Sequence, residues 1–178
     1  MTSIRSRLVL GALAGVLALA CVLALAARLF VPWLGPSSWT AGDDADKRQV
    51  AVTTAARKVT LAFLDVDYRD MDPRVDKVLA MATGEFKKQY QATKVNLVAA
   101  AREGESTSTG TVRSVGISDI DADAAVVFVA ADSKVDNKVM RAARAKGEKP
   151  DDQRYYRFQL HFTKVGARWL LDSLEIQS

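Results

Sequence analysis

The stretch YYRFQLHFTKV, residues 155–165, decides the fold class because the character of its side chains alternates along the chain. Its apolar residues Tyr156, Phe158, Leu160 and Phe162 are interleaved with the polar residues Arg157, Gln159, His161 and Thr163. A strand points successive side chains to opposite faces, so the alternation predicts one buried face and one wetter face. That pattern is typical of a strand in an antiparallel sheet.

Three other stretches favour strands around it, at residues 108–119, 124–135 and 168–176. The sequences DIDAD (119–123) and KVGAR (164–168) between them carry the turn-forming residues that join antiparallel neighbours. We therefore expect a four-stranded antiparallel meander in the second half of the chain.

A helical period precedes the strands. Apolar side chains recur at three- and four-residue spacing from about Asp44 to Leu64 and again over about residues 85–102, where Gly104 ends the pattern. A shorter helix is expected between them, at about residues 73–82. Helices followed by a run of strands indicate an α+β domain.

The short helix carries signals for both of its ends. Asp72 is expected to be its N-cap, with Pro73 at the first helical position. Gly84 fits the left-handed residue that closes such a helix. The whole pattern predicts about three helices packed on a curved four-stranded antiparallel sheet. The half-cone of nuclear-transport-factor-like (cystatin-like) domains is one fold of this kind, and its concave sheet leaves ligand binding open.

The N-terminal run LVLGALAGVLALACVLALAA, residues 8–27, has no charged side chain and is long enough to span a bilayer as a helix. We expect a cytoplasmic tail at 1–7, a single transmembrane anchor at 8–31, a linker at 32–43 and an extracytoplasmic α+β domain at 44–178. Arg5 and Arg7 favour a cytoplasmic N-terminus. Cleavage after Ala26 and lipidation of Cys21 are the alternatives to an uncleaved anchor.

Gly11 and Gly15 form a GxxxG pair within that run. Small residues on one face allow two membrane helices to approach closely, so the pair is a candidate for helix packing and self-association. A run so rich in alanine and glycine also produces this spacing by chance, and both interpretations stay open.

Composition excludes several classes of function. The chain has 25 basic and 21 acidic side chains, but Arg5, Arg7 and Arg28 lie in the N-terminal region, and removing those three from 25 leaves 22 against 21. A nucleic-acid-binding domain needs a concentrated basic excess, which this near-neutral remainder lacks. The single cysteine, Cys21, and the single histidine, His161, exclude a disulfide framework and a multi-histidine or cysteine metal site in the domain.

The most conspicuous polar cluster is DVDYRDMD, residues 65–72. Aspartates around Tyr68 are compatible with an acid/base site, with a cation site, or with a polar corner between two helices. The segment offers no histidine or lysine partner for proton transfer, and neither it nor the loop beginning at Asp119 has the glycine and closing glutamate of a calcium loop. A structural corner, in which Asp72 caps a helix and Asp70 favours its dipole, fits better. We expect no enzyme activity, cofactor or metal.

The connection DNKVMRAARAKGEKPDD, residues 136–152, is basic and is expected to be a loop. Its cations, Lys138, Arg141, Arg144 and Lys146, are candidates for contact with a partner protein. A solvated loop without a partner explains the same charges.

Several blocks of sequence follow one another in a recognisable order, and they include Tyr68, Asp70, Asp72, Gly84, Phe86, Tyr90, Gly110, Val112, Asn137 and Trp169. Together these ordered blocks resemble the Mce-associated membrane proteins of actinobacteria. The resemblance implies a non-enzymatic accessory protein that stabilises or organises an Mce-type lipid or sterol transport complex, with transporter subunits, the membrane and lipid as partners. It implies no catalytic residue. A structural subunit of a conjugation or secretion channel with the same cone fold is the alternative, and a small-ligand-binding cone is another.

Overall fold

The structure is a computed structural model that describes the backbone of residues 37–177 and side chains from Gly42 onward. The chain divides into two compact units, Met1–Asp46 and Lys47–Ser178. The expected anchor at 8–31, with Gly11 and Gly15, lies outside the described residues and stays a prediction. Within residues 37–177, none of the helices combines the length and the apolar character needed to cross a membrane.

The first described helix, α2, spans Ser37–Leu64 and therefore begins earlier than the Asp44 expected from sequence. Residues 37–43, which we had assigned to the linker, are helical. Gly42 lies inside the helix, where glycine costs roughly 1 kcal/mol relative to alanine. A long helix tolerates that cost, so the glycine in this stretch led to a predicted linker that was too long.

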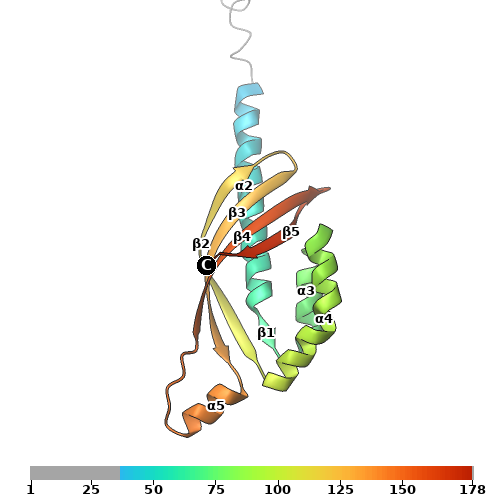
Figure 1. The fold of residues 1–178 in the computed structure, drawn as a ribbon. Coiled ribbons are helices and arrows are strands. Elements are labelled where there is room, and N and C mark those ends of the chain that lie inside the picture. The colour runs from blue at the N-terminus through green and yellow to red at the C-terminus, as the bar shows by residue number, and fades with distance from the viewer. Residues whose placement is uncertain (1–36, 178) are drawn as a thin grey trace, which may run out of the picture. The chain divides into compact units, whose positions relative to one another are not determined.

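Five strands form one antiparallel sheet in the order β1-β2-β3-β4-β5 (Figure 1). Their bounds are β1 Val66–Asp67, β2 Thr107–Ile120, β3 Ala124–Asp136, β4 Gln153–Val165 and β5 Arg168–Ile176. The four strands expected from sequence are present with similar bounds. The additional strand, β1, is a two-residue pairing in which Val66 lies opposite Ser108 and Asp67 opposite Thr107.

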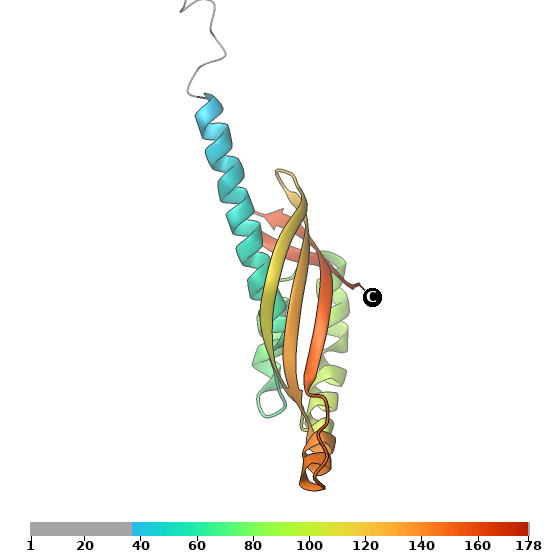
Figure 2. The same cartoon turned by 90° about the vertical axis from the view of Figure 1, so that its left-hand side faces the viewer.

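The alternation that identified the strands also determines which face of the sheet is buried. On β3, Val127 and Val129 are fully buried, and they lie directly opposite Leu160 and Phe158 of β4. Helix α2 covers this inner face with Val52, Ala56 and Val59, which belong to the same apolar core. Figure 2 shows β2, β3 and β4 as long curved strands with α2 alongside them.

Two more helices, α3 (Met71–Leu79) and α4 (Gly84–Gly104), build a second apolar cluster. Its buried members are Met71, Val75, Leu79, Val98 and Ala101. The segment between the helices pairs with the β5 edge, because the Leu171 N–H donates to the Met81 carbonyl (2.9 Å) and the Thr83 N–H donates to the Leu171 carbonyl (2.8 Å). These bonds join the helical pair to the sheet.

The structure corrects the ends expected for α3. The residue at its N-cap position is Asp70 rather than Asp72, and no side-chain cap bond forms. Pro73 lies in the first turn, where helix N–H groups have no intrahelical partner and a missing donor costs little. Gly84 does adopt the left-handed conformation, with φ 55°, but it begins α4 instead of closing α3.

The basic connection is not the loop we predicted. Residues Lys138–Ala145 form helix α5, which lies at the end of the β3–β4 hairpin (Figures 1 and 2). Asn137 is its N-cap, and the side-chain oxygen accepts a hydrogen bond from the Met140 N–H at 2.9 Å. A buried Met140 anchors the helix on its apolar side. Charge density concealed this short amphipathic pattern in the sequence.

Candidate functional site

Each aspartate of the acidic cluster at residues 65–72 forms an ion pair within the domain. Arg69 contacts Asp67 through two nitrogens, at 2.8 and 2.7 Å. Arg74 reaches both Asp65 (3.2 Å) and Asp70 (3.1 Å). The carboxylates are therefore used within the fold itself.

Three more pairs connect α3 to α4. Lys94 lies 2.5 Å from Asp76 and 3.9 Å from Asp72, and Arg102 lies 3.3 Å from Asp72. The hydrogen bonds from Arg69 hold the pKa of Asp67 at about 2, well below its usual 3.8, so this carboxyl is ionised under ordinary conditions. The pairing agrees with the structural-corner interpretation. Across the described residues there is no group of three or more His, Cys, Asp and Glu side chains arranged to hold a metal ion.

Several resemblance residues have structural roles that can be stated. A methyl group on Gly110 would lie 2.6 Å from the Leu64 Cβ, so β2 approaches the end of α2 too closely for any side chain. Tyr68 packs on the α3–α4 cluster, and Val112 packs on the main core. Trp169 is buried in the main core beneath Lys164, whose Nζ lies 5.9 Å from the ring centroid.

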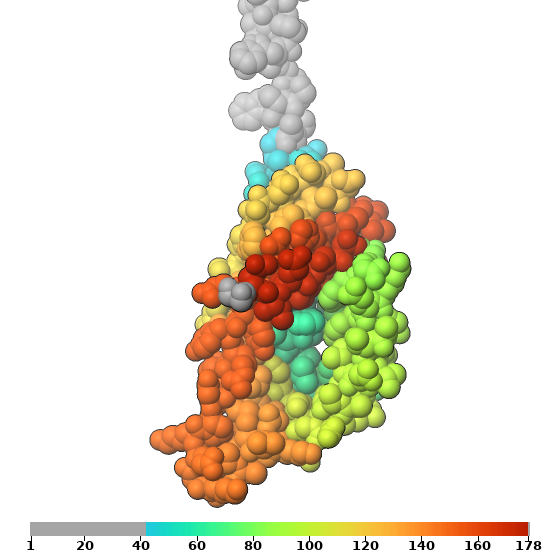
Figure 3. All heavy atoms as spheres, in the orientation of Figure 1, coloured from blue at the N-terminus to red at the C-terminus, as the bar shows by residue number. Residues whose placement is uncertain are grey.

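Aromatic side chains connect α4, α2 and β4. Phe86 stacks on Tyr90 at 5.5 Å, Tyr90 lies 6.1 Å from Phe63, and Phe63 meets Phe158 edge-on at 6.0 Å. Burial raises the pKa of the Tyr90 hydroxyl, which stays protonated. Figure 3 shows a hollow between α4 and the β4–β5 side, with atoms of α2 at its floor. These ring contacts pack α4 against α2 and β4.

The four cations proposed for partner contact lie on or just after α5, and two of them are engaged internally. Arg141 pairs with Glu105 and with Asp136 (3.4 Å), and Arg144 pairs with Asp136. Partial burial opposes ionisation of Asp136, but the hydrogen bonds from Arg144 and Arg141 outweigh it and lower its pKa. Lys138 and Lys146 are exposed. The arginines thus hold α5 in place, and partner contact through this helix stays a prediction.

The outer face of the sheet carries an apolar hollow that sequence patterns did not reveal. Phe128 is 45% exposed on β3, directly opposite Gly116 of β2 and Gln159 of β4. Since Gly116 has no side chain and nothing lies within 4 Å of where one would be, one side of the Phe128 ring is open. The residues that line the hollow include Ser114, Gly116, Phe128, Ala130, Arg157 and Gln177.

Polar groups border this hollow on β4. The Gln159 amide nitrogen lies 3.0 Å from the His161 Nε2, and Gln177 donates to the Gln159 oxygen at 3.2 Å. His161 therefore lies on the wetter face, as its alternation predicts, and contacts an amide rather than a carboxylate. Arg157 is exposed and has no ion pair with a described residue. The sequence AAVVFVAA around Phe128 is apolar throughout, so alternation could not separate its two faces.

The comparisons with known proteins assign the chain to a family. The profile of the family described as uncharacterized protein Rv1363c/MT1408-like matches residues 10–176. The chain belongs to this family. Its relative Rv1363c of Mycobacterium tuberculosis, also described as uncharacterized, is 24% identical over 132 residues. That alignment covers 74% of this chain, but this chain spans only about half (48%) of the relative's length.

Solved structures establish the fold of the Rv1363c/MT1408-like chain. CagV of Helicobacter pylori, a VirB8 homologue, matches with a TM-score of 0.55 at 8% identity, covering 72% of this chain and 98% of CagV. An IcmL-like type IV secretion system protein of Legionella pneumophila matches with a TM-score of 0.54 at 12% identity, covering 72% and 90%. The fold is thus an open five-stranded antiparallel sheet with four helices among the described residues, a nuclear-transport-factor-like cone. The family description does not name the Mce-associated proteins, so that finer resemblance stays a prediction.

Proposed function

We propose that this chain is a non-catalytic subunit of a multiprotein assembly in the cell envelope, closer in kind to a secretion-channel component than to a lipid-transport accessory. The observation that carries the proposal is the cone fold, shared over nearly their whole length with CagV and the IcmL-like protein, both named as type IV secretion proteins. Those identities are low, so the function of this chain is inferred from the kind of domain and not from common residues.

The chemistry of the domain supports a binding role rather than a reaction. The conspicuous carboxylates are neutralised by arginine and lysine within the fold, which leaves no free acid beside Tyr68 in the described structure. A catalytic carboxyl needs a pKa near the working pH, whereas the pKa of Asp67 is about 2. The anchor expected at residues 8–31 would hold the domain at the membrane, on the extracytoplasmic side.

The outer-face hollow is the contact surface that we propose for a partner subunit. A half-exposed phenylalanine beside an open glycine position accepts an apolar side chain, and burying the rest of the Phe128 ring would favour association. Arg157 on the border lacks an internal carboxylate partner among the described residues. The complementary surface is therefore an apolar side chain with a carboxylate next to it.

An Mce-type assembly is the second candidate, favoured by the ordered blocks from Tyr68 to Tyr90 and around Trp169. It needs the same anchored, non-catalytic domain and differs in the identity of its partners. The surface chemistry does not separate the two assemblies, so the experiment has to identify the partners directly.

The test is chemical cross-linking in native membranes, followed by purification of the tagged full-length chain and mass spectrometry of the cross-linked proteins. Two variants at exposed apolar positions are compared, Phe128→Glu in the hollow and Val95→Glu on the far helix α4, where Val95 is 77% exposed. Channel-type partners that are lost with Phe128→Glu and retained with Val95→Glu are the expected result. Mce transporter subunits in their place would favour the second candidate. Equal recovery with both variants would refute the contact surface, and recovery of no envelope complex from a folded sample would refute the function.

A further inference from the structure

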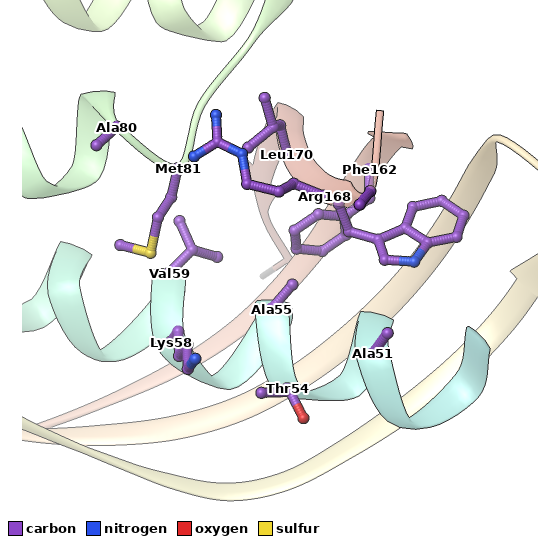
Figure 4. Close-up of a pocket in the computed structure, with 12 residues that line it drawn as sticks. Ala51, Thr54, Ala55, Lys58, Val59, Ala80, Met81, Phe162, Arg168 and Leu170 are labelled. Atoms are coloured by element: carbon purple, nitrogen blue, oxygen red, sulfur yellow. The ribbon is translucent and has the colours of Figure 1, made fainter. Parts of the chain in front are cut away.

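A second hollow, separate from the outer face of the sheet, opens between α2, the α3–α4 connection and the β4–β5 hairpin. Its volume is about 290 Å³. Its walls are apolar, with Ala55, Val59, Met81, Phe162, Trp169 and Leu170 among the lining residues. Figure 4 shows why the space exists: Ala51 and Ala55 of α2 present only methyl groups toward the side chains of the hairpin. This hollow lies entirely within the unit Lys47–Ser178.

Two cations border the hollow, and neither is neutralised. Lys58 on α2 and Arg168 at the start of β5 both line it, and Figure 4 shows the Arg168 side chain extending across toward Met81 and Leu170. Neither cation forms an ion pair with a described residue, and no acidic side chain lines the hollow. This contrasts with the corner arginines, each of which has a carboxylate.

A third positive group, Lys164, contacts one of the lining residues. The Lys164 Nζ lies over the Trp169 ring, 5.9 Å from its centroid. An anion bound in the hollow would be attracted by cations that have no acid beside them. The apolar wall and the unpaired cations therefore select for the same ligand from two sides: an apolar body with one negative group at its end.

From this chemistry we infer that the hollow binds a single-chain fatty carboxylate, with the chain against Ala55, Phe162 and Trp169 and the carboxylate between Lys58 and Arg168. The volume is at the lower end of the roughly 300–1,000 Å³ typical of small-molecule pockets, so one chain fits and a two-chain lipid does not. Guanidinium binds carboxylate with two parallel hydrogen bonds, which gives Arg168 the stronger part in recognition. The inference does not depend on the assembly role proposed above.

The test uses the full-length chain in nanodiscs of neutral phosphatidylcholine and a dodecanoate probe carrying a photoreactive diazirine near the end of its chain. Cross-linked peptides identified by mass spectrometry are expected to contain α2 residues around Ala55 or hairpin residues around Trp169. Unlabelled dodecanoate should suppress the labelling. Dodecanol, which has the same chain and no charge, should compete about tenfold more weakly, since a charge-assisted hydrogen bond is worth about that factor.

Three variants make the test specific. Ala51→Leu fills the hollow from an exposed α2 position and should reduce labelling severalfold, and Ala55→Leu should do so more strongly where the chain stays folded by circular dichroism. The double variant Lys58→Gln, Arg168→Gln should remove the preference for dodecanoate over dodecanol while leaving weak binding of both. Arg57→Gln is the matched control, because Arg57 is exposed on the same helix and does not line the hollow. Unchanged labelling in folded Ala51→Leu, or equal competition by dodecanol in the native chain, would overturn the inference.

Discussion

Gly110→Ala tests the tightest contact in the fold, between β2 and the end of α2. The new methyl group would lie 2.6 Å from the Leu64 Cβ and 2.9 Å from its Cδ1, far inside the roughly 3.5–4.0 Å at which carbon atoms attract. The Leu64 Cβ is fixed to the helix backbone, so a rotamer change cannot relieve the shorter contact. Strand and helix have to separate by about an ångström. Overpacking of this kind costs about 1–3 kcal/mol, and Leu64 is itself nearly buried.

The measurement is thermal and denaturant unfolding of the full-length chain, followed by circular dichroism. A loss of 1–3 kcal/mol corresponds to a fall in Tm of about 2–4 °C per kcal/mol for a domain of this size. Gly116→Ala on the same strand is the control, since nothing lies within 4 Å of its added methyl group. There the smaller entropy of the unfolded chain should leave stability unchanged or raise it by up to about 1 kcal/mol. Equal stability of the two variants would refute the close approach.

Three other outcomes follow from local geometry. Gly84→Ala should cost about 1–2 kcal/mol more than an ordinary surface change, because φ at Gly84 is 55°. It should also cost more than Gly166→Ala, where φ is 62° but the space around the glycine is open. Unfolding curves of the two variants provide the comparison. The ion pair between Asp67 and Arg69 should stabilise the fold above about pH 4 and lose that contribution as pH falls toward 2, because the pKa of Asp67 is lower in the folded chain than in the unfolded chain. Arg69→Gln should remove this pH dependence from acid-unfolding curves. Salt should weaken the same dependence in the native chain. Asn137→Ala should destabilise α5 by about 1 kcal/mol, seen as faster hydrogen exchange in its first turn, and unchanged exchange would contradict the cap.

The long strands could be predicted because their burial follows the alternation of the sequence. Phe158, Leu160 and Phe162 point to the core and their polar neighbours point away, as the pattern of residues 155–165 requires. A strand with one buried face shows an apolar residue at every second position of its sequence. The fold class followed from the order of helices and strands, and the comparisons confirm the cone at that level.

The short elements could not be predicted from a comparable pattern in the sequence. Strand β1 has only two residues, too few to show a period, and it exists because Val66 and Asp67 meet β2 after the chain has turned. Helix α5 has a clear amphipathic pattern, but Arg141 and Arg144 made the segment look like a solvated loop. These two arginines form ion pairs with Glu105 and Asp136, and Glu105 is distant from α5 in the sequence.

The candidate sites divide in the same way. The acidic corner could be interpreted from sequence, because Arg69 and Arg74 lie near Asp65, Asp67 and Asp70 along the chain. The outer-face hollow could not, since it depends on the pairing of Phe128 with Gly116 across two strands. An exposed aromatic within an apolar run gives no signal until the sheet register is known.

Charge pairing separates structural from binding residues better than charge density does. The corner and α5 hold the densest charge in the domain, yet Arg69, Arg74 and Arg141 already have carboxylate partners within the fold. An exposed pair of that kind adds little stability and offers little to a ligand, because a ligand has to compete with the internal acid. Lys58 and Arg168 are ordinary in the sequence, but they face an apolar hollow without an acid. An anion can therefore gain binding free energy at this hollow, whereas at the corner it has to compete with an internal carboxylate.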